Sequence, residues 1–171
     1  MHITIGSVEI SVCTANQLPH MVDAIVEEQD TNLLLDTNPV IQDTRESYRS
    51  LVKKMKRQKS LLSGQVIIKN TIPAKLTAII YDIERTPVCN EAVLAKVINN
   101  LLDTINRNKL KSVAMPPLGI THGKIPERVF IKLLKESLII RNPVYPEKIV
   151  LMAPPGKLDY IKAVIGDHCN E

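Results

Sequence analysis

Helical and strand-like patterns alternate along the second half of the chain. Apolar residues recur at helical spacing after Asn90, a residue type that suits a helix N-cap, and again over 127–138. Short apolar runs at 113–115 and 149–152 are typical of buried strands, and 157–165 predicts a terminal helix. This alternation predicts parallel strands with helices packed on the faces of the sheet.

Strand patterns outnumber helical ones in the first half. Residues 2–12 alternate loosely, and Gly6 with Ser7 in their middle predicts either a bulge or a tight turn between two short strands. The charged stretch 40–59 carries apolar residues at helical spacing and predicts a helix. We therefore expect an α/β fold, a three-layer α/β/α sandwich with a mixed central sheet. Further strands are predicted at 21–26, 65–68 and 76–81.

The composition fits one compact domain that covers residues 1–171. The chain is 44% hydrophobic, which is enough to fill a core, but aromatic residues make up only 3%. Scarce aromatic rings argue against a base-stacking nucleic-acid platform, so nucleic acid is not the expected partner. The net charge of +4 fits anionic ligands.

Targeting segments and metal sites have recognisable sequence patterns. The sequence has no apolar run long enough to span a bilayer and no signal-peptide pattern at its start. Cys13, Cys89 and Cys169 lack CxxC spacing, which fits reduced thiols and a cytoplasmic location. The histidines are scattered without ligand spacing, so we expect neither a metal nor a cofactor.

A glycine-containing loop follows the predicted strand at 113–115. It reads PPLGITHGKIP over 116–126 and leads into the helix at 127–138. Gly119 and Gly123 would let backbone N–H groups approach an anion, and Lys124 adds a cation. The alternative is a plain connection whose glycines serve only the turn. The loop is neither a Walker loop nor a GxGxxG motif.

Residues 112–126, SVAMPPLGITHGKIP, resemble the PALGTGHGGLP form of a loop in the macro domain family. VDAIV at 22–26, GQVIIKNTIPAKLTAIIYDI at 64–83 and NEAVLAKVINNLLDTINRN at 90–108 are similar to that family's strands and following helix. Members of the family commonly bind ADP-ribose, and some hydrolyse ADP-ribose esters. The resemblance implies a macro domain-like fold and a nucleotide ligand at the carboxyl ends of the strands.

The resemblance also implies a set of ligand-binding residues. Asn16 stands where the family has an Asp that reads adenine, and Asp30 stands where it has an Asn that contacts the distal ribose. The loop at 118–123 would wrap the diphosphate. The residues expected to bind the ligand are Asn16, Asp30, Leu118, Gly119, Ile120, Thr121, His122 and Gly123.

The first half departs from the family pattern. The family's Asn-Ala-Ala-Asn is replaced by Glu27, Glu28, Gln29 and Asp30, and its glycine-rich stretch by Thr-Asn-Pro-Val at 37–40. Carboxylates that face a diphosphate would repel it. We therefore expect ligand binding without canonical hydrolase activity, and we assign no catalytic residue.

Three other functions remain open from the sequence. Asp30 or His122 could serve an ADP-ribose ester hydrolase as general base. The chain could instead be an interaction domain that keeps the fold without the ligand site. The basic run KKMKRQK at 53–59 could bind nucleic acid, although a solvated helix end is the favoured explanation. The sequence leaves the oligomeric state open.

Overall fold

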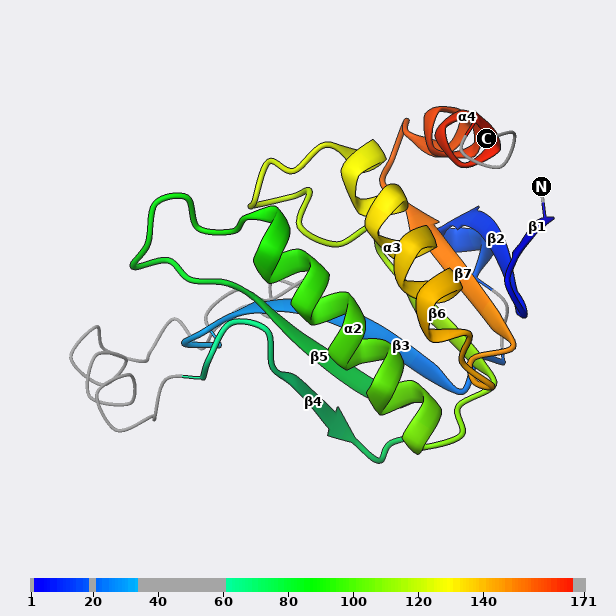
Figure 1. Ribbon diagram of the computed structural model, residues 1–171, viewed down its shortest axis with the longest axis horizontal. Coiled ribbons are helices and arrows are strands. Elements are labelled where there is room, and N and C mark those ends of the chain that lie inside the picture. The colour runs from blue at the N-terminus through cyan, green and yellow to red at the C-terminus, as the bar shows by residue number, and fades with distance from the viewer. Residues whose placement is uncertain (1, 19–20, 34–60, 168–171) are drawn as a thin grey trace.

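The computed structural model describes residues 2–18, 21–33 and 61–167. Within these ranges, a mixed seven-stranded sheet forms the centre of the molecule (Figure 1). Five neighbouring strands are parallel, and one further strand pairs antiparallel with the outermost strand on each side of these five. In spatial order the strands are β1 (His2–Ile5), β2 (Val8–Thr14), β7 (Lys148–Ala153), β6 (Ser112–Met115), β3 (Ala24–Asp30), β5 (Ala74–Tyr81) and β4 (Val66–Lys69).

Helices cover one face of this sheet. The helix α2 (Glu91–Arg107) lies beside α3 (Glu127–Arg141) across the strands, and α4 (Leu158–Asp167) packs near β2 (Figure 1). Asn90 caps α2, because its side-chain oxygen accepts a hydrogen bond from the Val93 N–H at 2.9 Å. The apolar face that α2 buries consists of Leu94, Val97, Ile98, Leu101, Leu102 and Ile105.

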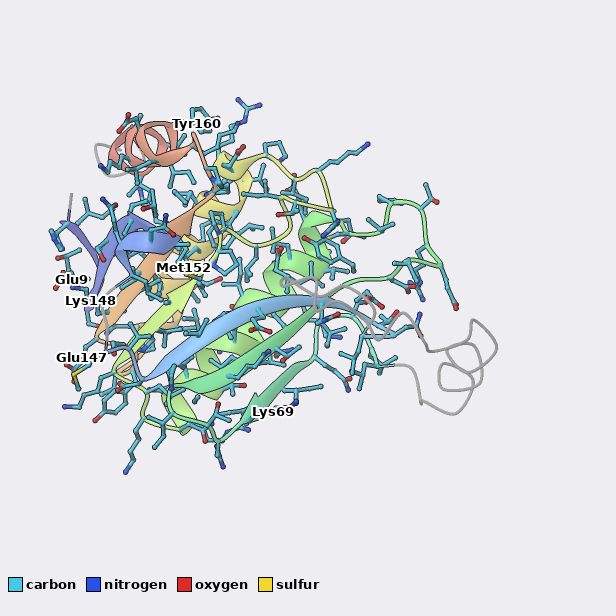
Figure 2. The ribbon with its side chains drawn as sticks, turned by 180° about the vertical axis from the view of Figure 1, so that it is seen from behind. Glu9, Lys69, Glu147, Lys148, Met152 and Tyr160 are labelled. Atoms are coloured by element: carbon cyan, nitrogen blue, oxygen red, sulfur yellow. The ribbon has the colours of Figure 1, made fainter. Side chains whose placement is uncertain are left out.

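Polar contacts fix the register at the amino ends of the strands. Asp23 precedes β3, and its Oδ2 accepts hydrogen bonds from the backbone N–H groups of Lys111 at 2.6 Å and Ser112 at 3.0 Å. Glu9 on β2 lies opposite Lys148 on β7, with 3.4 Å between Oε1 and Nζ (Figure 2). These contacts join β3 to β6 and β2 to β7 at the edge remote from the strand-following loops.

The α/β class and the mixed sheet are confirmed. Gly6, with φ of +60°, makes the tight turn between β1 and β2. Both boundaries of one strand were wrong: the strand predicted at 21–26 begins at Ala24 and continues through Asp30, because β5 pairs with its whole length. The helix predicted at 40–59 lies outside the described residues. No described helix has the length and apolarity needed to cross a membrane.

Matched isoleucines in two helices test the packing of α2. Ile98 is 1% exposed, whereas Ile140 on α3 is 82% exposed. We expect Ile98→Ala to lower the free energy of unfolding by about 2–5 kcal/mol, because it opens a cavity in the core. Ile140→Ala makes the same chemical change at the surface and should shift it by less than about 0.5 kcal/mol. Chemical denaturation measures both, and equal effects would contradict the assigned core.

Candidate functional site

The carboxyl ends of the five parallel strands share one edge of the sheet. Asn16 lies just after β2, in the short 3-10 helix η1 (Ala15–Gln17). Asp30 ends β3, and the loop at 118–123 follows the neighbouring strand β6. Ligands of open α/β sheets bind at such an edge. The fold therefore brings every predicted site residue to one edge, with Asp30 and the loop on adjacent strands.

The loop turns sharply at its first glycine. Gly119 has φ of +80°, a backbone conformation that favours glycine. Its N–H points inward and donates a hydrogen bond to Oε1 of Glu28 at 2.5 Å, while its carbonyl oxygen accepts one from the Ile125 N–H at 3.2 Å. Leu118 is completely buried beside it. The loop is thus anchored to the core by its own backbone.

A buried pair of polar side chains lies beneath the loop. The hydroxyl of Tyr81, at the end of β5, donates a hydrogen bond to Glu28 Oε1 at 3.1 Å. The His122 ring meets the Tyr81 ring edge to face, with 5.3 Å between the centroids. The Gly119 amide of the loop is therefore engaged by the protein's own Glu28–Tyr81 pair, and His122 packs against that pair.

Burial governs the electrostatics of this pair. It raises the pKa of the Glu28 carboxyl, and the hydrogen bonds from Gly119 and Tyr81 oppose that shift. It also raises the pKa of Tyr81, and the charge of Glu28 adds to the effect. Cys89 lies nearby, and burial followed by the charge of Glu28 raises its thiol pKa to about 11. All three groups are thereby biased toward their protonated forms.

The loop closes tightly at its second glycine. A Cβ atom on Gly123 would lie 2.5 Å from the Gly119 carbonyl oxygen, 3.0 Å from the Cys89 Cβ and 3.2 Å from Cε1 of Tyr81. The first neighbour is backbone and cannot rotate away. The close approach of the two ends of the loop therefore requires glycine at position 123. A simple turn between a strand and a helix would not impose this requirement.

The remaining predicted residues differ in their access to solvent. Asn16, Thr121 and His122 are exposed, and Ile120 is half-buried. Asp30 is completely buried, and its Oδ1 accepts a hydrogen bond from the Asn32 N–H at 2.6 Å. The outward surface of the site is thus formed by η1 and the tip of the loop, while Asp30 supports the turn that follows β3.

Sequence reasoning missed the role of Glu28. It grouped Glu27, Glu28 and Asp30 as carboxylates that could face a phosphate. The strand alternation separates them: Glu27 faces the other side of the sheet and forms an ion pair with Lys75 at 2.5 Å, whereas Glu28 is buried beneath the loop. Extending the strand to Asp30 would have revealed this, because Ala24, Val26 and Glu28 then share an inward face.

Metal binding finds no support in this part of the chain. The described residues contain no group of three or more His, Cys, Asp or Glu side chains arranged to hold a metal ion.

The chain is similar in structure to known macrodomains. No family model and no curated protein matches its sequence. A mutant Oceanobacillus iheyensis macrodomain with ADPR matches at a TM-score of 0.73 and 14% identity, over 100% of this chain and 99% of that one. The macrodomain of Thermus aquaticus DarG matches at 0.61 and 19%, over 85% and 98%. A Trypanosoma brucei macrodomain in complex with ADP matches at 0.65 and 12%, over 92% and 69%. These matches show that the chain has the macrodomain fold.

The buried Glu28 carboxyl predicts how stability depends on pH. Its pKa is raised in the folded state, so its contribution to stability is present at low pH and is lost as pH rises through that pKa. Glu28→Gln keeps the size and an acceptor oxygen but cannot titrate. We therefore expect the free energy of unfolding of the variant, relative to wild type, to increase from acidic to neutral pH. Denaturation at several pH values measures this, and a difference independent of pH would contradict it.

The tight approach at Gly123 predicts a cost for any side chain there. We expect Gly123→Ala to lower the free energy of unfolding by roughly 1–3 kcal/mol, because the added methyl group overlaps the Gly119 carbonyl. Gly156→Ala is the control, since its Cβ would meet nothing within 4 Å. Gly156 has φ of +75°, so that variant should lose only about 1 kcal/mol of backbone preference. A smaller loss at Gly123 than at Gly156 would refute the packing argument.

Proposed function

We propose that this chain binds ADP-ribose or a related nucleotide at the carboxyl edge of its sheet. The observation that carries the proposal is that Asn16 and the exposed tip of the 118–123 loop lie at that edge, with the buried Asp30 supporting the turn beside them. Neighbours of the same fold described with ADPR or ADP support the choice of ligand. Exposed Lys124 on the loop favours an anion, and Asn16 supplies a polar group for the base.

We further propose that the site binds without canonical hydrolysis. A general base must reach the water or proton that it activates. Asp30 is completely buried and accepts the hydrogen bond from Asn32, which commits it to the turn. His122 is exposed, but its ring packs edge to face against the ring of Tyr81. Incubation with an ADP-ribosylated ester substrate should therefore release no ADP-ribose above the buffer background.

Charge reversal at two matched lysines tests the binding proposal. Lys124 on the loop and Lys109 after α2 are both exposed and both have φ of +54°. Isothermal titration calorimetry of ADP-ribose should show saturable binding to the wild type. Lys124→Glu should weaken it by about tenfold or more, because a negative charge then faces the phosphates. Lys109→Glu carries the same strain and charge at the amino end of β6 and should bind as the wild type does.

The outcomes discriminate between a ligand-binding module and an interaction domain. No heat at millimolar ADP-ribose would reject the proposed function and favour an interaction domain. Equal losses in both lysine variants would mean that overall charge, and not this edge, governs binding.

A further inference from the structure

The Glu28 carboxylate accepts a hydrogen bond from the backbone N–H of Gly119 in the loop. An anionic ligand at the loop would need such a donor. Loops that bind phosphate do so by directing several N–H groups at it. Here the Gly119 N–H donates inward to Oε1 of Glu28 at 2.5 Å. The same oxygen accepts the hydrogen bond from the Tyr81 hydroxyl, so the loop backbone and Tyr81 meet at one buried carboxylate.

Within residues 2–18, 21–33 and 61–167, this carboxylate meets no neutralising cation. Among the described residues, no Lys or Arg side chain forms an ion pair with Glu28. The residue is only 6% exposed, so water screens its charge weakly. A charge held one hydrogen bond behind the loop backbone therefore acts on whatever lies on the other side of that backbone.

We infer that Glu28 determines the specificity of the site. While Glu28 is ionised, its carboxylate accepts the hydrogen bond of the Gly119 N–H and places a negative charge behind the loop. The site therefore disfavours diphosphates relative to uncharged nucleosides. The inference rests on the proposed function, since it concerns the same site. Protonation of Glu28 removes the charge, so diphosphate affinity rises as pH falls through the raised pKa of this carboxyl.

Other titratable groups lie around Glu28. Tyr81 at the end of β5 donates a hydrogen bond to it, and Cys89 before α2 feels its charge. His122 packs against Tyr81, and Asp30 lies two residues further along the same face of β3. Burial favours the neutral forms of Tyr81 and Cys89. Because histidines also gain a positive charge as pH falls, a His122 variant is needed to distinguish any effect of His122 on binding from that of Glu28.

Calorimetry with two probes on the full chain tests the inference. Glu28→Gln keeps an acceptor for the Gly119 N–H and removes the charge. We expect it to bind ADP-ribose about tenfold more tightly than wild type at neutral pH, with adenosine affinity unchanged. The wild type should bind ADP-ribose more tightly at acidic pH. This trend should persist in His122→Gln and vanish in Glu28→Gln.

A measurement without ligand covers the case of a variant that fails to fold. In the wild type, the amide proton resonance of Gly119 should move with pH as Glu28 titrates, because the two share a hydrogen bond of 2.5 Å. An amide resonance that stays constant as the carboxyl titrates would overturn the inference without any variant.

Results that contradict the role of Glu28 differ from results that contradict the proposed function. Three results would overturn the role of Glu28 and leave the proposed function standing, provided that the wild type binds ADP-ribose. In the first, Glu28→Gln leaves the affinity for ADP-ribose unchanged or weakens it. In the second, Glu28→Gln changes the affinity for adenosine equally, and in the third, the pH dependence disappears in His122→Gln. Absence of ADP-ribose binding in both the wild type and Glu28→Gln would reject the proposed function and this inference together.

Discussion

Parallel pairing of five adjacent strands is the constraint on which the arrangement of the site depends. Strands that pair in parallel must end at the same edge, so the segments after β2, β3 and β6 meet there although they are far apart in sequence. Asp23 and the Glu9–Lys148 pair fix the register at the opposite edge. The position of the loop thus follows from contacts at the far ends of the strands.

The second constraint is the buried Glu28 carboxyl. Burying a carboxylate is costly, and the hydrogen bonds from Tyr81 and Gly119 offset part of that cost. The same bonds tie β3, β5 and the loop together. One side chain therefore both stabilises the loop and limits what the loop offers to an anion, which explains how a glycine-containing loop of this fold is held in place from within.

Much of the fold could be predicted from sequence because periodicity reports local burial. The Asn90 cap, the apolar face of α2 and the turn at Gly6 depend on neighbours close in the chain. The extent of β3 was missed, because charged residues at 27–30 mask a strand that is specified by pairing with β5 and β6. The Glu28–Gly119 contact joins residues 91 positions apart, which no local pattern encodes. The loop was predicted from its glycines and its place between a strand and a helix, whereas Asn16 and Asp30 were assigned to the site only through the family resemblance.

The buried environment around Glu28 also determines the reactivity of the Cys89 thiol. Burial and the charge of Glu28 raise the thiol pKa of Cys89 to about 11, so the protonated thiol predominates at neutral pH. The thiolate is the form that attacks disulfides, electrophiles and peroxides. This cysteine adjoins the candidate site and yet will resist alkylation and oxidation there, so a covalent probe or a redox signal directed at the site will find no reactive sulfur at Cys89.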